Sequence, residues 1–317
     1  MAAGDLVIGG VSVAPGETRR MELPVARLPT QTMVSVPVVA VHGRRSGPRI
    51  WITAAVHGDE INGVEIVRRV LGRVDPKDLR GSLIAVPVVN VFGFISKSRY
   101  LPDRRDLNRS FPGSRRGSLA SRIAELLMNQ VVRQCGYGID LHTAGERRTN
   151  LPQIRGELED AEVRGLARAF GAPVVLHSRT RDGSLRAAAT ASGGKVLLFE
   201  GGETNRFNPE VIRVGVRGVL RVLARLGMRP SRAAAEGREV VECHSSTWIR
   251  ARRSGLFRPE VELGAMVSAR DRLGIITNVY GDVVDRVAAS TDGMVIGAAV
   301  DPLVNRGDGL VHVGEVG

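Results

Sequence analysis

The chain has 317 residues, of which 43% are hydrophobic and 25% charged, so it has the composition of a globular protein with one large or two ordinary domains. Its two cysteines, Cys135 and Cys243, exclude a disulfide scaffold. The longest apolar stretch, Leu83 to Ile95, is interrupted by Asn90 and is too short to span a bilayer, and the N-terminus lacks a basic segment followed by an apolar one. We therefore expect a cytoplasmic protein without a membrane partner.

The net charge is +12, and almost all of the excess is arginine because lysine occurs only three times. Nucleic-acid binding would require a basic stripe with interleaved aromatic residues, whereas aromatic residues make up only 4% of the chain. A polyanion-binding module is therefore a minor alternative, and no nucleic-acid partner is expected. Three arginine pairs near the motifs described below are candidates for a positive entrance that attracts anionic substrates: Arg104 with Arg105, Arg115 with Arg116, and Arg147 with Arg148.

Strand-like and helix-like segments alternate up to residue 226, which predicts an α/β domain. Strands are expected at 33–41, 50–56, 83–89, 138–141, 174–176 and 196–199, and helices at 61–71, 123–132, 158–170 and 211–226. Residues 93–117 form a long irregular segment rich in Arg, Pro, Asp and Ser. A loop of this length inside a compact domain is usually functional.

The pattern changes after residue 226. Residues 227–238 are rich in Arg, Ala and Ser and lack apolar periodicity, which makes them the best linker candidate. Beyond them, short β-prone runs at 266–267, 273–279, 283–288, 294–296 and 309–313 are separated by glycines at turn-like intervals. We therefore expect two domains, 1–238 and 239–317, of which the second is small and all-β.

Candidate metal ligands follow two of the expected strands. His57 and Glu60 are three residues apart where the strand at 50–56 gives way to a helix, so one turn of chain can bring both to one ion. The strand at 138–141 leads into His142, and Asp140 shares a strand face with this histidine, which suggests that its carboxylate supports the site. Two histidines and a glutamate with an open fourth position are typical of catalytic zinc, which acidifies a bound water and polarises a carbonyl. We predict one Zn²⁺ per chain, although such ligands also accept cobalt or manganese.

Glu200 is the candidate general base. It emerges from the buried strand at 196–199 into the glycine turn Gly201-Gly202. A carboxylate in this position is expected to take a proton from the attacking water and to deliver it to the leaving nitrogen.

The irregular segment carries side chains suited to a substrate. Asn108 and Arg109 are expected to clamp a carboxylate near the scissile bond, because arginine offers a bidentate fork and asparagine a neutral donor. Arg99 is the first choice, and Arg105 the second, for stabilising the oxyanion that develops during attack on the carbonyl. Asp106 is expected to hold a metal-binding histidine through its other ring nitrogen.

The motifs resemble those of the succinylglutamate desuccinylase and aspartoacylase family, which is related to zinc carboxypeptidases. HGDE at His57 to Glu60, DLNRxFPG at Asp106 to Gly113, DLHT at Asp140 to Thr143 and the strand-ending Glu200 occur in the family's order. The resemblance covers nearly the whole chain. It implies a zinc-carboxypeptidase-like mixed sheet flanked by helices, with a small C-terminal β domain that narrows entry to the site.

The resemblance also implies roles for individual residues. It places zinc on His57, Glu60 and His142, and catalysis on Glu200. It assigns oxyanion stabilisation to Arg99 and the substrate carboxylate to Asn108 and Arg109. The family's C-terminal domain often contributes a tyrosine to the substrate pocket, for which Tyr280 is the candidate here.

The leading prediction is a zinc-dependent amidohydrolase that removes the acyl group from a small N-acyl amino acid or a related carboxylate-bearing metabolite. The alternative is a metallocarboxypeptidase acting on peptides, which would use the same metal, base and clamp. A capping β domain favours small substrates. The acyl group is not identified by the sequence, and Arg147, Arg148 and Asn150 are further candidates for contact with the substrate. Self-association of the chain stays open.

Overall fold

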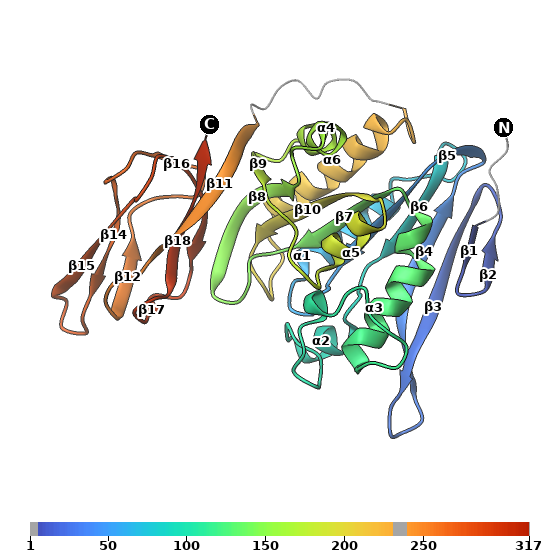
Figure 1. Ribbon diagram of the computed structural model, residues 1–317, viewed down its shortest axis with the longest axis horizontal. Helices are drawn as coiled ribbons and strands as arrows, with labels where there is room; N and C mark the ends of the chain where they lie inside the picture. The colour runs from blue at the N-terminus through green and yellow to red at the C-terminus, as the bar shows by residue number, and fades with distance from the viewer. Residues whose placement is uncertain (1–5, 231–239, 317) are drawn as a thin grey trace.

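The computed structural model describes residues 6–230 and 240–316 (Figure 1). Its main sheet contains twelve strands: β3 (Glu17–Arg27), β4 (Met33–His42), β5 (Arg45–Ala54), β6 (Arg80–Val86), β7 (Tyr137–His142), β8 (Arg148–Gly156), β9 (Val174–His177), β10 (Lys195–Gly202), β11 (Val241–Arg250), β13 (Met266–Val267), β16 (Gly293–Ala299) and β18 (Gly309–Val316). Their spatial order is β13-β16-β18-β11-β9-β8-β10-β7-β5-β6-β4-β3. Strands β6, β5, β7 and β10 run parallel to one another, whereas β8 is antiparallel to β10. The sheet is therefore mixed.

Helices cover both faces of this sheet. Successive side chains of a central strand point to opposite faces, and apolar side chains occur on both faces. The main helices are α1 (Asn62–Leu71), α3 (Leu119–Gln130), α4 (Ala161–Phe170) and α6 (Pro209–Arg225). Ile50 and Ile52 of β5 belong to the core shared with α1, α4 and α6, whereas Trp51 between them belongs to the core shared with α3. This period of two is what a strand buried on both faces requires.

The C-terminal region contains strands and no helix among the described residues 240–316, as predicted. Strands β12 (Gly255–Pro259), β14 (Arg272–Thr277), β15 (Val283–Ala288) and β17 (Leu303–Val304) form a separate four-stranded sheet. Its buried side chains, such as Phe257 and Leu273, share one core with Val295 of β16 and with Val311 and Val313 of β18. The other C-terminal strands continue the main sheet, because β11 pairs with β9 and β16 pairs with β8 (Figure 1). The region is thus joined to the rest by backbone hydrogen bonds.

Most of the predicted linker, namely residues 231–238, lies outside the described residues, so the boundary at residue 238 stays a prediction. Near the N-terminus, β1 (Leu6–Ile8) and β2 (Val11–Val13) form a small antiparallel pair. No helix in the described part of the chain has the length and hydropathy needed to cross a bilayer.

Several elements were not predicted from the sequence, among them the strands β8, β11 and β12 and two helices, α2 (Val91–Ser96) and α5 (Leu185–Ala191). Helix α2 overlaps the start of the segment expected to be irregular, and the single turn η1 (Leu107–Arg109) lies within it. A second turn, η2 (Val132–Gln134), follows α3. Strand β8 mixes polar and apolar side chains, so its sequence lacks a clear period. As shown below, β8 and the start of α5 carry residues of the functional site.

Candidate active site

The candidate site lies at the carboxyl ends of the parallel strands β5, β7 and β10, where open α/β sheets place their ligands. His57 follows β5, His142 ends β7, and Glu200 lies in β10 directly opposite His142 in the strand register. Three segments that are far apart in sequence therefore meet because their strands are neighbours in the sheet.

The chain turns sharply between β5 and His57. Ala55 has a φ of 48°, in the left-handed region that costs a residue other than glycine about 1–3 kcal/mol. Its carbonyl accepts a hydrogen bond from the amide of Asn90 at 2.9 Å, which fixes this turn. Gly58 lies so close to α2 that a Cβ atom would be 1.9 Å from the carbonyl carbon of Gly93. The tight backbone places His57 and Glu60 on one side of the turn.

His57, Glu60 and His142 form a buried cluster that can hold a metal ion, because one potential ligand atom from each lies within 4.8 Å of the others. The Nδ1 atoms of both histidines face Glu60, at 2.7 Å from Oε1 for His57 and 2.8 Å from Oε2 for His142. Burial raises the pKa of Glu60, but the two histidines outweigh it and lower this pKa overall. Burial likewise lowers the pKa of each histidine, but Glu60 and neighbouring aspartates outweigh it and raise both values.

Two aspartates approach the opposite ring nitrogens of these histidines. Oδ2 of Asp140 lies 2.8 Å from Nε2 of His142, and Oδ1 of the same residue accepts a hydrogen bond from Thr53 at 2.7 Å. Oδ1 of Asp106 lies 3.3 Å from Nε2 of His57. Nε2 of His142 is thus hydrogen-bonded to a carboxylate, whereas Nε2 of His57 has a carboxylate nearby but no hydrogen bond among the described residues. In both histidines Nδ1 faces the cluster.

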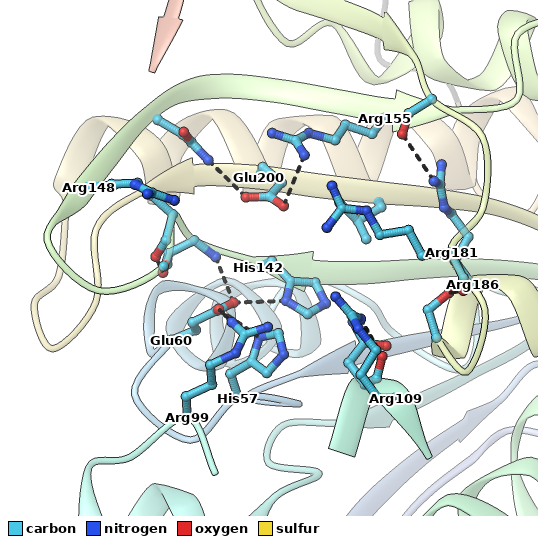
Figure 2. A pocket seen from close by; sticks show the side chains of 18 of the residues that line it. His57, Glu60, Arg99, Arg109, His142, Arg148, Arg155, Arg181, Arg186 and Glu200 are labelled. Atoms are coloured by element: carbon cyan, nitrogen blue, oxygen red, sulfur yellow. Dashed lines mark hydrogen bonds and ion pairs between the residues drawn. The ribbon is translucent and has the colours of Figure 1, made fainter. Parts of the chain in front are cut away.

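A pocket of about 330 Å³ opens over this cluster (Figure 2). Its walls are rich in arginine, and its polar and charged lining residues are His57, Glu60, Arg99, Asn108, Arg109, His142, Thr143, Arg148, Asn150, Arg155, Ser178, Arg181, Ser184, Arg186 and Glu200, with Trp248 beside them. Six arginines against two glutamates make the pocket strongly positive. Such a lining attracts anionic ligands.

Glu200 faces the pocket across from His142 (Figure 2). Its side chain is 17% exposed. Asn150 of β8 donates a hydrogen bond to Oε2 at 2.8 Å, and Nη1 of Arg155 lies 3.8 Å from Oε1. The carboxylate is therefore oriented by two side chains of β8, a strand that was not predicted from the sequence.

Asn108 and Arg109 also line the pocket, on η1. Oδ1 of Asn108 accepts a hydrogen bond from the amide of Leu185 at 2.9 Å, so the side-chain NH₂ group is the end left to donate to a ligand. Gly183 packs against the same turn, with space so limited that a Cβ atom would lie 2.6 Å from the Arg109 carbonyl oxygen. The loop before α5 thus holds the predicted clamp in place.

Of the two oxyanion candidates, the structure brings Arg99 to the site. Its Nη1 lies 3.3 Å from Nδ1 of His57 and 3.5 Å from Glu60, and its Nη2 forms an ion pair with Asp106 at 2.9 Å. Arg105 has a side chain that is 63% exposed and pairs with Asp103 outside the pocket.

Tyr280 is not brought to the site. It is 88% exposed and lies in the turn between β14 and β15, which belong to the separate C-terminal sheet and do not line the pocket. The C-terminal region contributes Trp248 of β11 instead. Among the three arginine pairs proposed for a positive entrance, only Arg148 lines the pocket.

Three arginines of the pocket were not predicted from the sequence, namely Arg155, Arg181 and Arg186. Arg186 is only 6% exposed and one of its guanidinium nitrogens, Nη1, has no hydrogen-bond partner; burial lowers the pKa of this side chain to about 10. A local signal existed for α5, because Ser184 precedes an alanine-rich run and caps the helix by accepting from the amide of Ala187. No local signal shows that Arg155 points into the pocket.

Comparisons with known proteins agree with this geometry. Residues 46–226 match the sequence model described as the succinylglutamate desuccinylase/aspartoacylase catalytic domain. An N-alpha-acetyl-L-2,4-diaminobutyric acid deacetylase from Halomonas elongata is 29% identical over 301 residues, which cover 89% of this chain and 86% of that protein.

Two solved structures have a similar fold. A succinylglutamate desuccinylase/aspartoacylase from Rhodobacter sphaeroides superposes with a TM-score of 0.84 and 29% identity, covering 96% of this chain and 98% of its own. The product-bound ectoine utilization protein EutE from Ruegeria pomeroyi gives a TM-score of 0.85 and 23% identity, covering 94% and 95%, respectively. The similarity extends over nearly the whole chain, including the C-terminal β region.

Proposed function

Because this chain belongs to the succinylglutamate desuccinylase/aspartoacylase family, we propose that it is a zinc-dependent deacylase that hydrolyses the amide bond of a small N-acyl amino acid or related carboxylate-bearing metabolite. One observation carries the proposal: the cluster of His57, Glu60 and His142 opens into the same pocket as Glu200 and the Asn108 side chain. The deacetylase name of the Halomonas elongata relative supports amide hydrolysis of an acylated amino acid.

The donor set fits zinc. It consists of two imidazole nitrogens and a carboxylate, all buried, and Asp140 and Asp106 approach the remote ring nitrogens as outer partners do in zinc enzymes. When bound, zinc would supply a Lewis acid that acidifies water and polarises a carbonyl. The mixed sheet with ligands at its carboxyl edge further supports a zinc-carboxypeptidase-like fold.

Side chains around the cluster have complementary roles in this mechanism. Asn108 and Arg109 bind the substrate carboxylate and thereby orient the scissile amide. Glu200, oriented by Asn150, removes a proton from the attacking water and delivers it to the leaving nitrogen. Arg99 donates hydrogen bonds to the carbonyl oxygen as negative charge develops on it.

We also propose that residues 1–238 form the catalytic domain and that residues 239–317 form a C-terminal β domain that caps the site. Trp248 in the pocket wall supports the capping role. A cap that narrows the pocket favours small acylated amino acids over peptides.

The test begins with metal content. Freshly purified wild-type protein should contain about one zinc per chain, and the His142→Ala variant should lose it. Hydrolysis is then compared on a panel of N-acyl amino acids and a panel of peptides with free C-termini, with and without a chelator. Chelator-sensitive release of amino acids from the first panel supports the proposal. Cleavage of peptides alone would indicate a carboxypeptidase, and absence of metal after zinc is offered would contradict both activities.

A further inference from the structure

Two side chains of β8 hold the candidate base Glu200. Asn150 donates a hydrogen bond to Oε2 of this carboxylate at 2.8 Å, and Nη1 of Arg155 lies 3.8 Å from its Oε1 (Figure 2). Both carboxylate oxygens therefore depend on β8 for their placement. These two side chains can orient Glu200 only if they are themselves held in place.

Strand β8 contains one extra residue beside Glu200. In the antiparallel register of β8 with β10, Gln153 lies opposite Glu200. Asn150 lies opposite Gly202, so three steps along β8 match two steps along β10. Because successive side chains of a regular strand alternate between faces, Asn150 and Gln153 would otherwise point to opposite sides. The bulge, which includes Pro152, brings both side chains to the face of Glu200.

Strand β16 of the C-terminal region lies against this bulge. Gly297 of β16 is paired with Asn150 in the register of β16 with β8. A Cβ atom on Gly297 would lie 2.7 Å from Oδ1 of Asn150, which is too close for a carbon and an oxygen that are not bonded. Glycine at this position therefore leaves the space that the Asn150 amide occupies. Since Asn150 is only 5% exposed, an added methyl group would displace its amide from Glu200.

A second contact of β16 reaches Glu200 through Gln153. This side chain is fully buried, and its Nε2 donates a hydrogen bond to the Ile296 carbonyl at 3.1 Å. Its Oε1 accepts a hydrogen bond from Nε of Arg155 at 3.4 Å, and Nη1 of the same guanidinium faces Glu200. Because Ile296 offers a carbonyl oxygen, the NH₂ end of the Gln153 amide faces β16 and the oxygen end faces the arginine.

Resting on the proposed deacylase function, we propose that strand β16 positions the general base, with Gly297 and Gln153 as positioning residues for Glu200. Gly297 acts by leaving room for the Asn150 amide, and Gln153 acts by holding Arg155. The C-terminal β region thereby contributes to the chemical step as well as to the wall of the pocket. Neither positioning residue lines the pocket, so replacing either should lower kcat with little change in KM.

The variant Gly297→Ala tests the first contact by steady-state kinetics on the N-acetyl amino acid that wild type cleaves fastest. Its kcat should fall about tenfold, as for loss of the Asn150 hydrogen bond, with KM changed less than about threefold and zinc content unchanged. The double variant Gly297→Ala with Asn150→Ala should be no slower than Asn150→Ala alone, because removal of the amide makes room for the methyl group.

Gly136→Ala is the matched control for this substitution. Gly136 is exposed and a Cβ atom there would meet nothing within 4 Å, so this variant should have the kcat of wild type. An unchanged kcat in Gly297→Ala would overturn the role of Gly297. A further fall of about tenfold in the double variant, relative to Asn150→Ala, would overturn the route through Asn150.

Gln153→Met tests the second contact and stays informative if Gly297→Ala does not fold. Methionine has a similar length but forms no such hydrogen bonds to Ile296 and Arg155, so kcat should fall about 3- to 10-fold. In a Glu200→Gln background the same substitution should cause no further fall, because the base that Gln153 positions is already lost. An unchanged kcat, or an equal fall in both backgrounds, would overturn the role of Gln153. Thermal midpoints verify the folding of each variant.

NMR signals of side-chain amides distinguish failure of this inference from failure of the proposed function. If wild type hydrolyses none of the N-acyl amino acids, the deacylase proposal is contradicted, and the placement of Asn150 can still be measured. Its NH₂ signals, identified by their loss in Asn150→Ala, should shift in Glu200→Gln and in Gly297→Ala and stay unchanged in Gly136→Ala. Signals in Gly297→Ala that coincide with those of wild type would overturn the positioning role.

Discussion

The substitution Asp140→Asn is expected to weaken metal binding while leaving the fold intact. Asp140 is fully buried, with Oδ2 at 2.8 Å from Nε2 of His142 and Oδ1 accepting a hydrogen bond from Thr53. Asparagine has nearly the same shape, so it creates no cavity, and its amide oxygen can still accept a hydrogen bond from the imidazole. What is lost is the negative charge that strengthens Nδ1 of His142 as a ligand.

Loss of such an outer partner typically weakens metal binding by about 10- to 100-fold, which corresponds to about 1.4–2.7 kcal/mol of binding free energy. The short contact and complete burial of Asp140 place it towards the upper end of this range. Asp106→Asn should lie towards the lower end, because Asp106 is 3.3 Å from His57 and also pairs with Arg99.

Zinc dissociation constants for these variants can be measured by competition with a chromogenic chelator at one fixed pH, with circular dichroism to verify folding. Glu203→Gln is the matched control, since Glu203 follows Glu200 closely, pairs with Arg206 and does not line the pocket. An Asp140→Asn variant that binds zinc as tightly as wild type would refute the role assigned to this carboxylate. Equal weakening in Glu203→Gln would instead indicate a general effect of charge.

Three further outcomes are expected. Glu200→Gln should keep its metal while turnover falls about 10²- to 10⁴-fold, and near-normal turnover would remove Glu200 from the mechanism. Asn150→Ala removes the hydrogen bond to Oε2 of Glu200, so kcat should fall about tenfold with metal content unchanged; an unchanged kcat would show that Asn150 does not orient the base. His312→Phe should reduce the acid sensitivity of folding, because burial lowers the pKa of His312 from its ordinary value of 6.5 to about 3 in the folded chain. Below pH 6.5 the His312 imidazole is therefore protonated in the unfolded chain but stays neutral in the folded chain. Between pH 8 and pH 5, wild type should lose about 2 kcal/mol more of its free energy of unfolding than the variant. Urea unfolding at both pH values measures this difference, and identical pH dependence in the two proteins would contradict it.

The two candidate metal-binding histidines and Glu200 were predictable from sequence because they lie at or just beyond the ends of apolar runs. Each of the strands β5, β7 and β10 contains short apolar stretches, and a polar residue directly after such a stretch marks the carboxyl edge of a parallel sheet. His57, His142 and Glu200 all stand in this position. The pattern is local, so no knowledge of the tertiary structure was needed to find it.

The rest of the pocket was less accessible to sequence reasoning. Arg155 and Asn150 lie on β8, whose inward-facing polar side chains break the apolar alternation by which strands are recognised. The polar residues with which β8 contributes to the pocket are thus also the reason that this strand is not recognised from the sequence. Tyr280 shows the opposite error, because an aromatic residue in the C-terminal region was available, yet its hairpin belongs to a sheet that does not reach the pocket.

By itself the sequence determined the α/β class of the first part of the chain, the β-rich C-terminal region and the residues that follow buried strands, since these depend on hydrophobic periodicity and on strand ends. Only the tertiary structure decided which arginines face the pocket and that Trp248, rather than Tyr280, joins them. The physical reason is that these contacts depend on strand order. Pairing of β16 with β8 and of β11 with β9 brings the C-terminal strands to the pocket. Such pairing uses backbone hydrogen bonds, which do not depend on which side chains the strands carry, so it cannot be recognised in the sequence.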